Sequence, residues 1–352
     1  MGDDPLDRDA RIKLSIGTRQ QGDDSQRFAP FNLAFDHRGL LLVVESNTHR
    51  VQAFSFDDDD GDGASLVSKF GEQGDEPGQF KCPADLAIDH DHDRIFVVDH
   101  YHNRVQIWSL SEQSFLSCID QHVSRDIELK RPHGVAIDKH HHRIIITDSS
   151  NNRLVFLSSI DLSFLFSIGK RGYRPGEFYY PSGIAIDHDR HRIIVCDTHN
   201  FRVQVLSSID GSFLFKFGSQ GDQPHQFKRP QGVCIDNQGR IIIADFNNRR
   251  LQAFTPEGHP ISSFDSGSEY CLAVAFDEHR GLIAFSTSSR VHVIGANQWL
   301  ADTFAWRPDR HQHAPSSIKQ AILTMTMIRS LVDDSAMSMI PNELLFEIFS
   351  FL

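Results

Sequence analysis

Residues 184–218 read IAIDHDRHRIIVCDTHNFRVQVLSSIDGSFLFKFG, and this stretch decides the fold. It holds four short apolar runs, rich in Ile, Val and Phe, at 184–187, 192–197, 202–206 and 212–217. Each break between the runs carries Asp, His, Asn or Gly, residues that favour turns. Four runs this short and this closely spaced fit no helical period. The stretch therefore predicts a four-stranded antiparallel meander.

The same pattern recurs along the chain. The aspartate that ends its first run stands, in steps of 53, 49, 49, 49 and 41 residues, at Asp36, Asp89, Asp138, Asp187, Asp236 and Asp277. A one-layer meander cannot bury both of its faces alone, whereas copies stacked around an axis bury them against one another. Six copies of the unit therefore predict an all-β fold, a six-bladed β-propeller.

Three segments carry a resemblance to a known family. The runs DTHNFRVQV (197–205) and DHYHNRVQI (99–107) resemble the NHL repeat, and so does the lead-in FGEQGDEPGQFKCPADLAID (70–89). The resemblance extends over about residues 11–305 and implies an NHL-type propeller, a non-catalytic module that recognises a partner. Blade six departs from the repeat, because Phe285 stands where the aspartate before the second turn is expected.

Composition limits the compartment and says little about the partner. The chain has 352 residues and a formal charge of −12, but much of this charge comes from four aspartates in residues 1–10 and five in residues 57–62. Its five cysteines form no CxxC pair, which is typical of a reducing compartment, so we expect a cytoplasmic location. The first ten residues do not resemble a signal peptide, and no apolar run approaches about 18 residues, so we expect no membrane segment.

The pattern predicts four parts: a disordered tail (1–10), the propeller (11–306), a linker (307–317) and a short α-helical C-terminal tail (318–352). RIKLSIG (11–17) resembles a fourth strand and precedes the first full unit. We expect it to complete blade six and close the ring, which would protect the sheet edges. The alternative fourth strand of that blade is ANQWLADTF (296–304).

Charged pairs that repeat from blade to blade indicate structure more than catalysis. A carboxylate ends the second run and an arginine follows five residues later at Glu45/Arg50, Asp99/Arg104, Asp148/Arg153, Asp197/Arg202 and Asp245/Arg250. Catalysis needs one asymmetric site, so we expect these pairs to brace the turns by charge-assisted hydrogen bonds. No catalytic residue is predicted.

Two features point to a metal ion, and neither is complete. Residues 58–63 open like a calcium loop, but Lys69 stands where a bidentate Glu would complete the shell, so a solvated loop is the preferred interpretation. Some six-bladed enzymes that resemble this architecture hold zinc with one inward His from each of three blades. Here the inward residues are Phe31, Ala84, His133, Ser182 and Gln231, and one His does not make such a site. We predict no metal and no cofactor.

The loops that lead into each blade and the turns between second and third runs are expected to share one face, which we call the top face. In blades three to five this face gathers a basic–aromatic sector, made of Lys130, Arg131, Lys170, Arg171, Tyr173, Arg174, Tyr179, Tyr180, Phe201, Lys228, Arg229, Phe246 and Arg249. Basic groups attract anionic chains, and exposed rings anchor peptide side chains or stack on bases. We expect the sector to bind a protein or peptide, with single-stranded RNA as the alternative.

The segment IPNELLFEIFSFL (340–352) resembles the start of an F-box, with Leu344, Leu345, Ile348 and Phe349 among the matching residues. This resemblance implies docking to a Skp-type adaptor, and with it a role as substrate receptor or scaffold in ubiquitin-dependent protein degradation. Only these 13 residues carry it. The alternative is an amphipathic helix that pairs with a second helix at 318–332.

Overall fold

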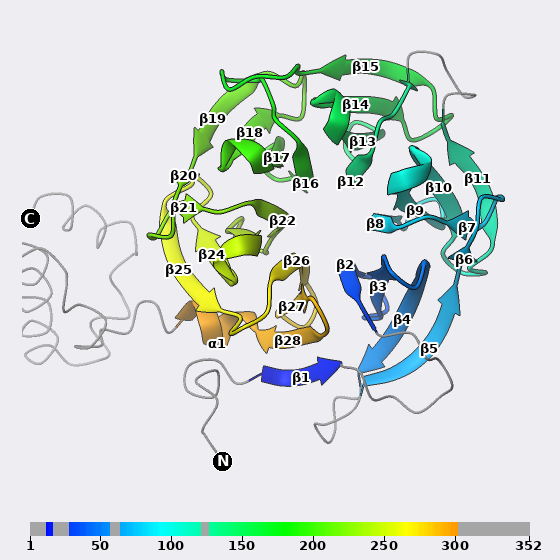
Figure 1. The fold of residues 1–352 in the computed structure, drawn as a ribbon, viewed down its shortest axis with the longest axis horizontal. Coiled ribbons are helices and arrows are strands. Elements are labelled where there is room, and N and C mark those ends of the chain that lie inside the picture. Colours follow the sequence, from blue (N-terminus) through cyan, green and yellow to red (C-terminus); the bar gives the residue numbers. More distant parts are fainter. Residues whose placement is uncertain (1–11, 17–27, 57–63, 121–126, 302–352) are drawn as a thin grey trace, which may run out of the picture. The chain divides into compact units, whose positions relative to one another are not determined.

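The computed structural model describes residues 12–16, 28–56, 64–120 and 127–301. These residues form six four-stranded antiparallel sheets, arranged as blades around one axis (Figure 1). The first strand of each blade lies at the axis and the fourth lies at the rim. The predicted six-bladed β-propeller is thus confirmed.

The blades follow the order of the sequence. They comprise β2 (Pro30–Phe35), β3 (Leu41–Glu45), β4 (Arg50–Phe56) and β5 (Ala64–Phe70) in blade one; β8 (Pro83–Asp89), β9 (Arg94–Asp99), β10 (Arg104–Ser109) and β11 (Phe115–Ile119) in blade two; β12 (Pro132–Asp138), β13 (Arg143–Asp148), β14 (Arg153–Ser158) and β15 (Phe164–Ile168) in blade three; β16 (Pro181–Asp187), β17 (Arg192–Asp197), β18 (Arg202–Ser207) and β19 (Phe213–Phe217) in blade four; β22 (Pro230–Ile235), β23 (Ile241–Asp245), β24 (Arg250–Phe254) and β25 (Pro260–Asp265) in blade five; and β26 (Cys271–Asp277), β27 (Leu282–Thr287), β28 (Val291–Gly295) and β1 (Ile12–Ile16) in blade six.

Smaller elements complete the described part of the chain. Two lead-in loops contain short parallel pairs, β6 (Glu72–Gln73) with β7 (Gln79–Phe80) and β20 (Ser219–Gln220) with β21 (Gln226–Phe227). The turns between second and third strands contain the 3-10 helices η2 (His100–His102), η4 (Ser149–Asn151), η5 (Thr198–Asn200) and η6 (Phe246–Asn248). A short α-helix, α1 (Ala296–Ala301), follows β28.

Each of these 3-10 helices is followed by one residue with left-handed backbone, which reverses the chain before the next strand begins. Asn103 and Asn152 hold this conformation with φ of 55° and 56°, as is common for Asn. In blades four and five the same position is held by Phe201 and Arg249, with φ of 54° and 53°. The fold therefore fixes two large side chains on top-face turns where small ones are usual.

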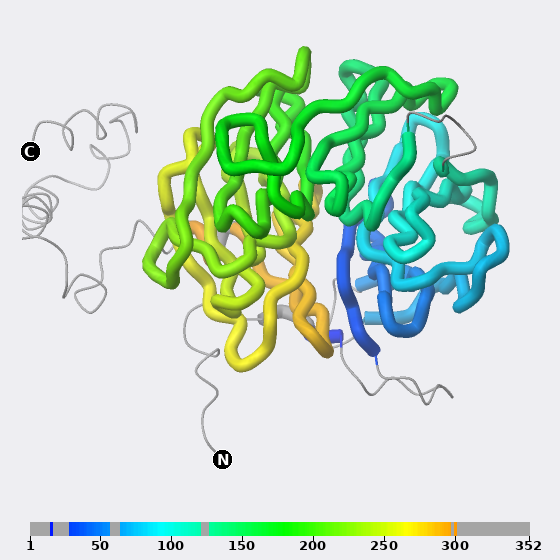
Figure 2. Tube along the Cα trace, turned by 45° about the horizontal axis from the view of Figure 1, so that its top comes forward, coloured from blue at the N-terminus to red at the C-terminus, as the bar shows by residue number. Residues whose placement is uncertain are grey.

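The core lies between neighbouring blades. Between blades three and four, for example, Ile145 and Phe156 pack in one cluster with Ile193, and all three are fully buried. Phe178 and Phe227, which lie at one position of two lead-in loops, are also fully buried, as expected for plugs beneath the top face. Figure 2 follows the ring from blade one in blue to blade six in orange, where the first strands β2 and β26 lie side by side.

The ring is closed by the N-terminal strand, as predicted. β1 pairs antiparallel with β28, with Ile16 opposite Val291, so that blade six takes its fourth strand from the opposite end of the chain. Ile16 is 4% exposed and packs in the cluster between blades six and one. The alternative for this strand is wrong, because its residues 296–301 form α1 instead.

The expectation for Phe285 is also wrong. The strand register pairs Cys271 with Thr287, in the way that Pro181 pairs with Asp197, so Thr287 occupies the position of the missing aspartate. A carboxylate is still present there, because Glu269 from the lead-in loop accepts hydrogen bonds from Thr287 and Ser289.

The chain divides into two units, Met1–Leu300 and Ala301–Leu352. The predicted tail 1–10, the acidic loop 58–63, the linker 307–317 and the helical tail with its F-box-like motif lie outside the described residues and stay predictions. Within the described ranges, no helix is long and apolar enough to cross a lipid bilayer.

Candidate functional site

The buried carboxylates at the ends of second strands fix the loops of the top face. Asp197 is fully buried; its Oδ1 accepts the backbone N–H of Tyr179 at 2.8 Å, and its Oδ2 accepts Nε–H of Arg202 at 2.7 Å. Arg202 in turn donates to backbone carbonyls of the same lead-in loop. The carboxylate and loop bonds recur at Asp99, Asp148 and Asp245, and Glu45 accepts from Arg50 at 3.3 Å. The pairs are therefore braces, as predicted, and they hold loop against turn.

A second set of bonds ties neighbouring blades together around the axis at four of the six boundaries. The residue directly after the brace carboxylate donates to the carbonyl of the proline that starts the next blade. Thr198 reaches Pro230 at 2.8 Å and the Nδ1–H of His100 reaches Pro132 at 2.9 Å, and Ser46 and Ser149 do the same for Pro83 and Pro181. The axial rim of the top face is thus preorganised across four blade boundaries.

All residues of the predicted basic–aromatic sector are exposed or half-buried. Several guanidinium groups lie over aromatic rings: Arg171 over Tyr179 at 4.8 Å, Arg131 over Tyr101 at 5.5 Å, Arg229 over Phe246 at 5.5 Å and Arg249 over Tyr270 at 5.2 Å. Phe246 and Tyr270 are stacked, with centroids 4.7 Å apart and 13° between their planes. Arg229, Phe246, Tyr270 and Arg249 therefore form one continuous row across blades five and six, with a cation at each end and two stacked rings between them.

These four arginines keep their charge available to a ligand. No described carboxylate lies within 4.0 Å of their guanidinium groups. The two lysines of the lead-in loops differ, since Lys170 lies 3.5 Å from Glu177 and Lys228 lies 3.3 Å from Asp222. Four further residues of the sector form no ring stack or ion pair with described residues. These are Lys130, Tyr173, Arg174 and Phe201.

Sequence reasoning missed three residues of this surface. Tyr101 and Tyr270 each receive an arginine, and His199 stacks on Tyr180 with centroids 4.7 Å apart. Tyr101 lies in η2, and Phe246 lies in the corresponding turn of blade five, η6. This shared turn is a sequence signal that could have indicated Tyr101. Tyr270 precedes Cys271, where the other described blades start with Pro, and nothing in the repeat pattern marks it as a ring partner.

A pocket of about 360 Å³ opens at the axis, where first strands of several blades begin on the top face. Its lining comes from five blades and contains Arg131, Arg229, His100, His133 and His199, but no Asp or Glu. Burial and repulsion from His100 and Arg229 lower the pKa of His133 to about 3, and burial followed by Arg229 also lowers the pKa of His199. Both imidazoles are thus neutral at neutral pH, in a positive potential set by the arginines.

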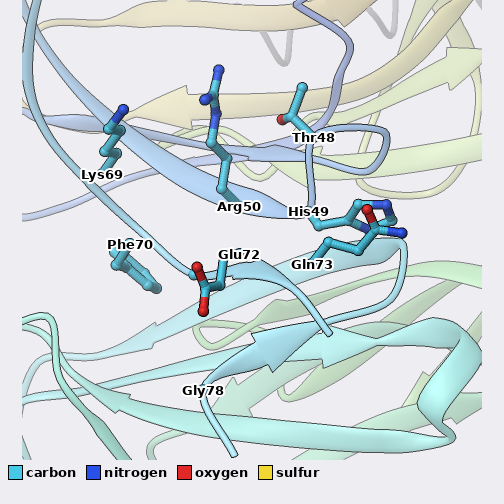
Figure 3. A pocket seen from close by; sticks show the side chains of 9 residues that line it. Thr48, His49, Arg50, Lys69, Phe70, Glu72, Gln73 and Gly78 are labelled. Atoms are coloured by element: carbon cyan, nitrogen blue, oxygen red, sulfur yellow. The ribbon is translucent and has the colours of Figure 1, made fainter. Parts of the chain in front are cut away.

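A larger hollow of about 600 Å³ lies between blades one and two. Figure 3 shows its lining, with Lys69 and Arg50 on one side and Glu72 on the other. Its lining residues Arg50, Lys69 and Glu72 belong to β4, β5 and β6. None of these is a first strand at the axis, so the hollow lies away from the axial pocket. It gathers polar side chains of both charges and offers no matched acid–base or metal-ligand set.

The described residues contain no group of three His, Cys, Asp or Glu side chains placed to hold a metal ion. All five cysteines are free thiols. Burial raises the pKa of each of them, including half-buried Cys82 at the axial pocket, so none is an activated thiolate nucleophile.

Comparisons with known proteins agree with this architecture. A family model for the NHL repeat matches residues 178–206 and 227–254, and a model described as a 6-bladed beta-propeller matches residues 28–127. A search of curated proteins found no significant match. Among solved structures, the Kuenenia stuttgartiensis hydrazine synthase is similar at 10% identity with a TM-score of 0.56, covering 78% of this chain and 97% of that one, which is a likeness of fold alone. The chain therefore contains NHL repeats and is built as a six-bladed β-propeller, a fold consistent with a binding or scaffold role.

Proposed function

We propose that this chain is a non-catalytic recognition module, which binds a protein or peptide partner through the top face of its propeller. The main observation behind the proposal is the continuous row of Arg229, Phe246, Tyr270 and Arg249, with two stacked rings between two guanidinium groups. Arginine and aromatic side chains dominate the energetics of protein interfaces, because they combine a large apolar area with directed polar contacts. Their preorganisation by the braces lowers the entropy that binding costs.

Charge on the surrounding loops supports a protein partner over a nucleic acid. A track for phosphates would need Lys170 and Lys228 as free cations. They are instead paired with Glu177 and Asp222, respectively. The lead-in loop of blade two adds exposed Glu72, Asp75 and Glu76 to the same face. Such a mixed surface suits a protein with both charges better than a uniformly anionic chain.

Single-stranded RNA is the second candidate ligand. It is favoured by Arg171 and Tyr179, an exposed cation on a ring, because bases stack on such rings while the guanidinium binds phosphate. Arg174 lies in the same loop and is exposed. These residues would have to bind RNA without the neutralised lysines.

Two finer assignments complete the proposal. The free thiols are consistent with a reducing compartment, and we propose a cytoplasmic location. If the segment 340–352 acts as an F-box-like motif, the propeller would be a substrate receptor or scaffold in ubiquitin-dependent degradation. Co-purification of a Skp-type adaptor with the full chain, and its loss in a Leu345→Ala, Ile348→Ala variant, would support that role. Absence of capture would remove it and leave the recognition function intact.

The recognition function is tested by selecting short peptides displayed on phage against the full chain. Selected peptides should bind about tenfold more weakly to an Arg171→Ala, Arg249→Ala variant, because interface arginines contribute strongly to affinity. A His140→Ala, His142→Ala variant is the matched control, since both histidines lie in the β12–β13 turn at the opposite ends of the strands. Failure to recover any peptide, or equal losses in the two variants, would contradict the proposal.

The RNA alternative has its own measurement. Binding of single-stranded RNA at low salt is compared between the parent and a variant with Lys170, Arg171, Arg174, Lys228 and Arg229 neutralised. If RNA is the ligand, the parent should bind and its affinity should fall steeply with salt, because phosphate contacts release counterions. No measurable binding at low salt removes this alternative.

A further inference from the structure

The axial pocket supports an inference about the chemical group that the partner presents, and this inference rests on the proposed function. Arg131 and Arg229 occupy one position in two different blades, directly before the proline that starts the first strand. Both have left-handed backbone, with φ of 48° and 77°, which is uncommon for a residue with a side chain. The backbone N–H of Arg131 is held by Asn103 at 2.8 Å, and the carbonyl of Arg229 accepts the N–H of Phe246 at 3.1 Å. The fold therefore builds two arginines into the pocket on fixed turns.

The pocket is cationic and lacks any internal counter-charge. Its lining holds no carboxylate, and no described carboxylate lies within 4.0 Å of either guanidinium. The guanidinium groups lie on the rings of Tyr101 and Phe246, which orient them without neutralising them. Both arginines are exposed, and no described carboxylate pairs with them, so an oxyanion that enters the pocket can accept charge-assisted hydrogen bonds from them.

Two residues deeper along the same strands, polar atoms lack partners. His133 and Gln231 follow the arginines, and the amide Nε2 of Gln231 lies 3.4 Å from Nε2 of His133. The Nδ1 atom of His133 and the Oε1 atom of Gln231 are buried and have no hydrogen-bond partner among the described residues. Leaving such atoms unpaired costs about 1 to 3 kcal/mol each, so their retention at this point is consistent with a polar ligand.

We propose that the axial pocket is an anion-binding site, which takes one carboxylate or phosphate group presented on a side chain of the protein partner and holds it between Arg131 and Arg229. The size agrees, because about 360 Å³ accommodates one side chain with its solvent and not a folded element. Tyr180 and His199, which stack on each other and line the pocket, would form one contact surface for the peptide next to the inserted residue. The pocket would bind one anionic group at the axis, while Phe246 and Tyr270 farther out would supply apolar contact area.

The test uses the full chain, an Arg131→Gln, Arg229→Gln variant and a Lys139→Gln, Lys216→Gln control, which removes the same formal charge from exposed positions outside the pocket and the sector. N-acetylglutamate and phosphoserine serve as isolated probes, and their binding is followed by NMR of the probe. The parent and the control should bind at least one probe, and the pocket variant should bind it about tenfold more weakly. Preference for glutamate would assign an acidic partner, and preference for phosphoserine a phosphorylated one. Unchanged melting temperatures would establish that all three proteins are folded.

A double-mutant cycle separates this inference from the proposed function. In a peptide selected on the top face, replacing its acidic residue by Ala should weaken binding to the parent about tenfold and have little effect on binding to the pocket variant. If the losses of affinity from the peptide substitution and from the pocket substitutions are strictly additive, the proposed anion site is wrong, while top-face recognition stays intact. Probes that bind parent and pocket variant equally, or fail to bind the parent, would also overturn it. Oligouridylate binding that falls steeply with salt, and that neutralising Lys170, Arg171 and Arg174 weakens as much as the pocket substitutions do, would assign the surface to RNA instead.

Discussion

The Nε atom of Arg202 lies 2.7 Å from Oδ2 of Asp197, and this carboxylate is fully buried in the turn that joins β17 to β18. The same Oδ2 accepts from the side-chain amides of Asn200 at 2.9 Å and Gln204 at 3.0 Å. Three donors converge on one oxygen, and no other described carboxylate lies within 4.0 Å of the Arg202 guanidinium. A buried cation in such a network depends on this one anion.

Replacing Asp197 by Asn should therefore destabilise the protein by about 3 kcal/mol, because an amide NH2 would then face three donors and Arg202 would lose its counter-charge. The measurement is the free energy of urea unfolding. Asp222→Asn is the matched control, since Asp222 is 65% exposed and pairs with Lys228 only at the surface. Equal midpoints for the two variants would contradict the role of Asp197 as a brace.

Closure of the ring predicts a contribution from the N-terminal strand. Ile16→Ala should cost about 2 to 4 kcal/mol, because Ile16 is buried between blades six and one and its removal leaves a cavity. Deleting residues 1–16 should lower the melting temperature further, since it also exposes the edge of β28. Deleting only residues 1–10 keeps β1 and is the control. A full deletion that leaves the melting temperature unchanged would mean that β1 does not close the ring.

The first strands of blades four and five approach each other closely enough at Gly183 to require glycine there. A Cβ on Gly183 would lie 2.2 Å from the carbonyl oxygen of Gln231 in the next blade. Gly183→Ala should therefore cost about 2 to 3 kcal/mol through overpacking at the axis. Gly176→Ala is the comparison, because a Cβ there meets nothing within 4 Å and the cost of about 1 kcal/mol arises only from its φ of 74°. Urea unfolding of both variants checks the order, and a smaller loss for Gly183→Ala would contradict the close approach.

Much of the blade architecture could be predicted from the sequence, because strand period and turn residues are local properties. The run 192–197 is β17 to the residue, and the paired positions of Asp197 and Arg202 alone indicate the brace. The position of Thr287 could not be predicted, because its lead-in and second turn differ in length from the repeat and only the register of β26 with β27 fixes it.

The candidate site divides in the same way. The basic–aromatic sector could be predicted, since its residues lie in loops that the repeat identifies. The pairing of Arg229 with Phe246 and the stacking of Phe246 on Tyr270 could not, because they depend on side-chain directions across two blades. The axial pocket likewise depends on five blades meeting at one point, which no local pattern encodes.

Asp85 is the buried acid whose titration the structure makes testable. It holds the axial position that Gly183 and Gly232 hold in later blades, and its Oδ2 accepts the backbone N–H of Val135 in blade three at 2.9 Å. Burial raises the pKa of Asp85 from 3.8 to about 7, although the bonds from Val135 and Leu86 act in the opposite direction. The folded protein thus binds a proton at pH values where the unfolded chain has released it. Stability from this group is greatest below about pH 4 and is lost as the pH rises toward 7.

Asp85→Asn should remove that loss, because an amide at this position does not titrate. Asn32 already fills the equivalent position in blade one, where its Oδ1 accepts the N–H of Leu33 at 2.7 Å, so the residue type fits the axis. The free energy of unfolding of the variant relative to the parent should increase by about 3 kcal/mol between pH 5 and pH 8, in favour of the variant, since about two pKa units are involved and each corresponds to about 1.4 kcal/mol. Histidines elsewhere titrate in both proteins and cancel in the comparison. A difference that stays constant over this range would mean that Asp85 is ionised throughout, held as a carboxylate by its two backbone bonds.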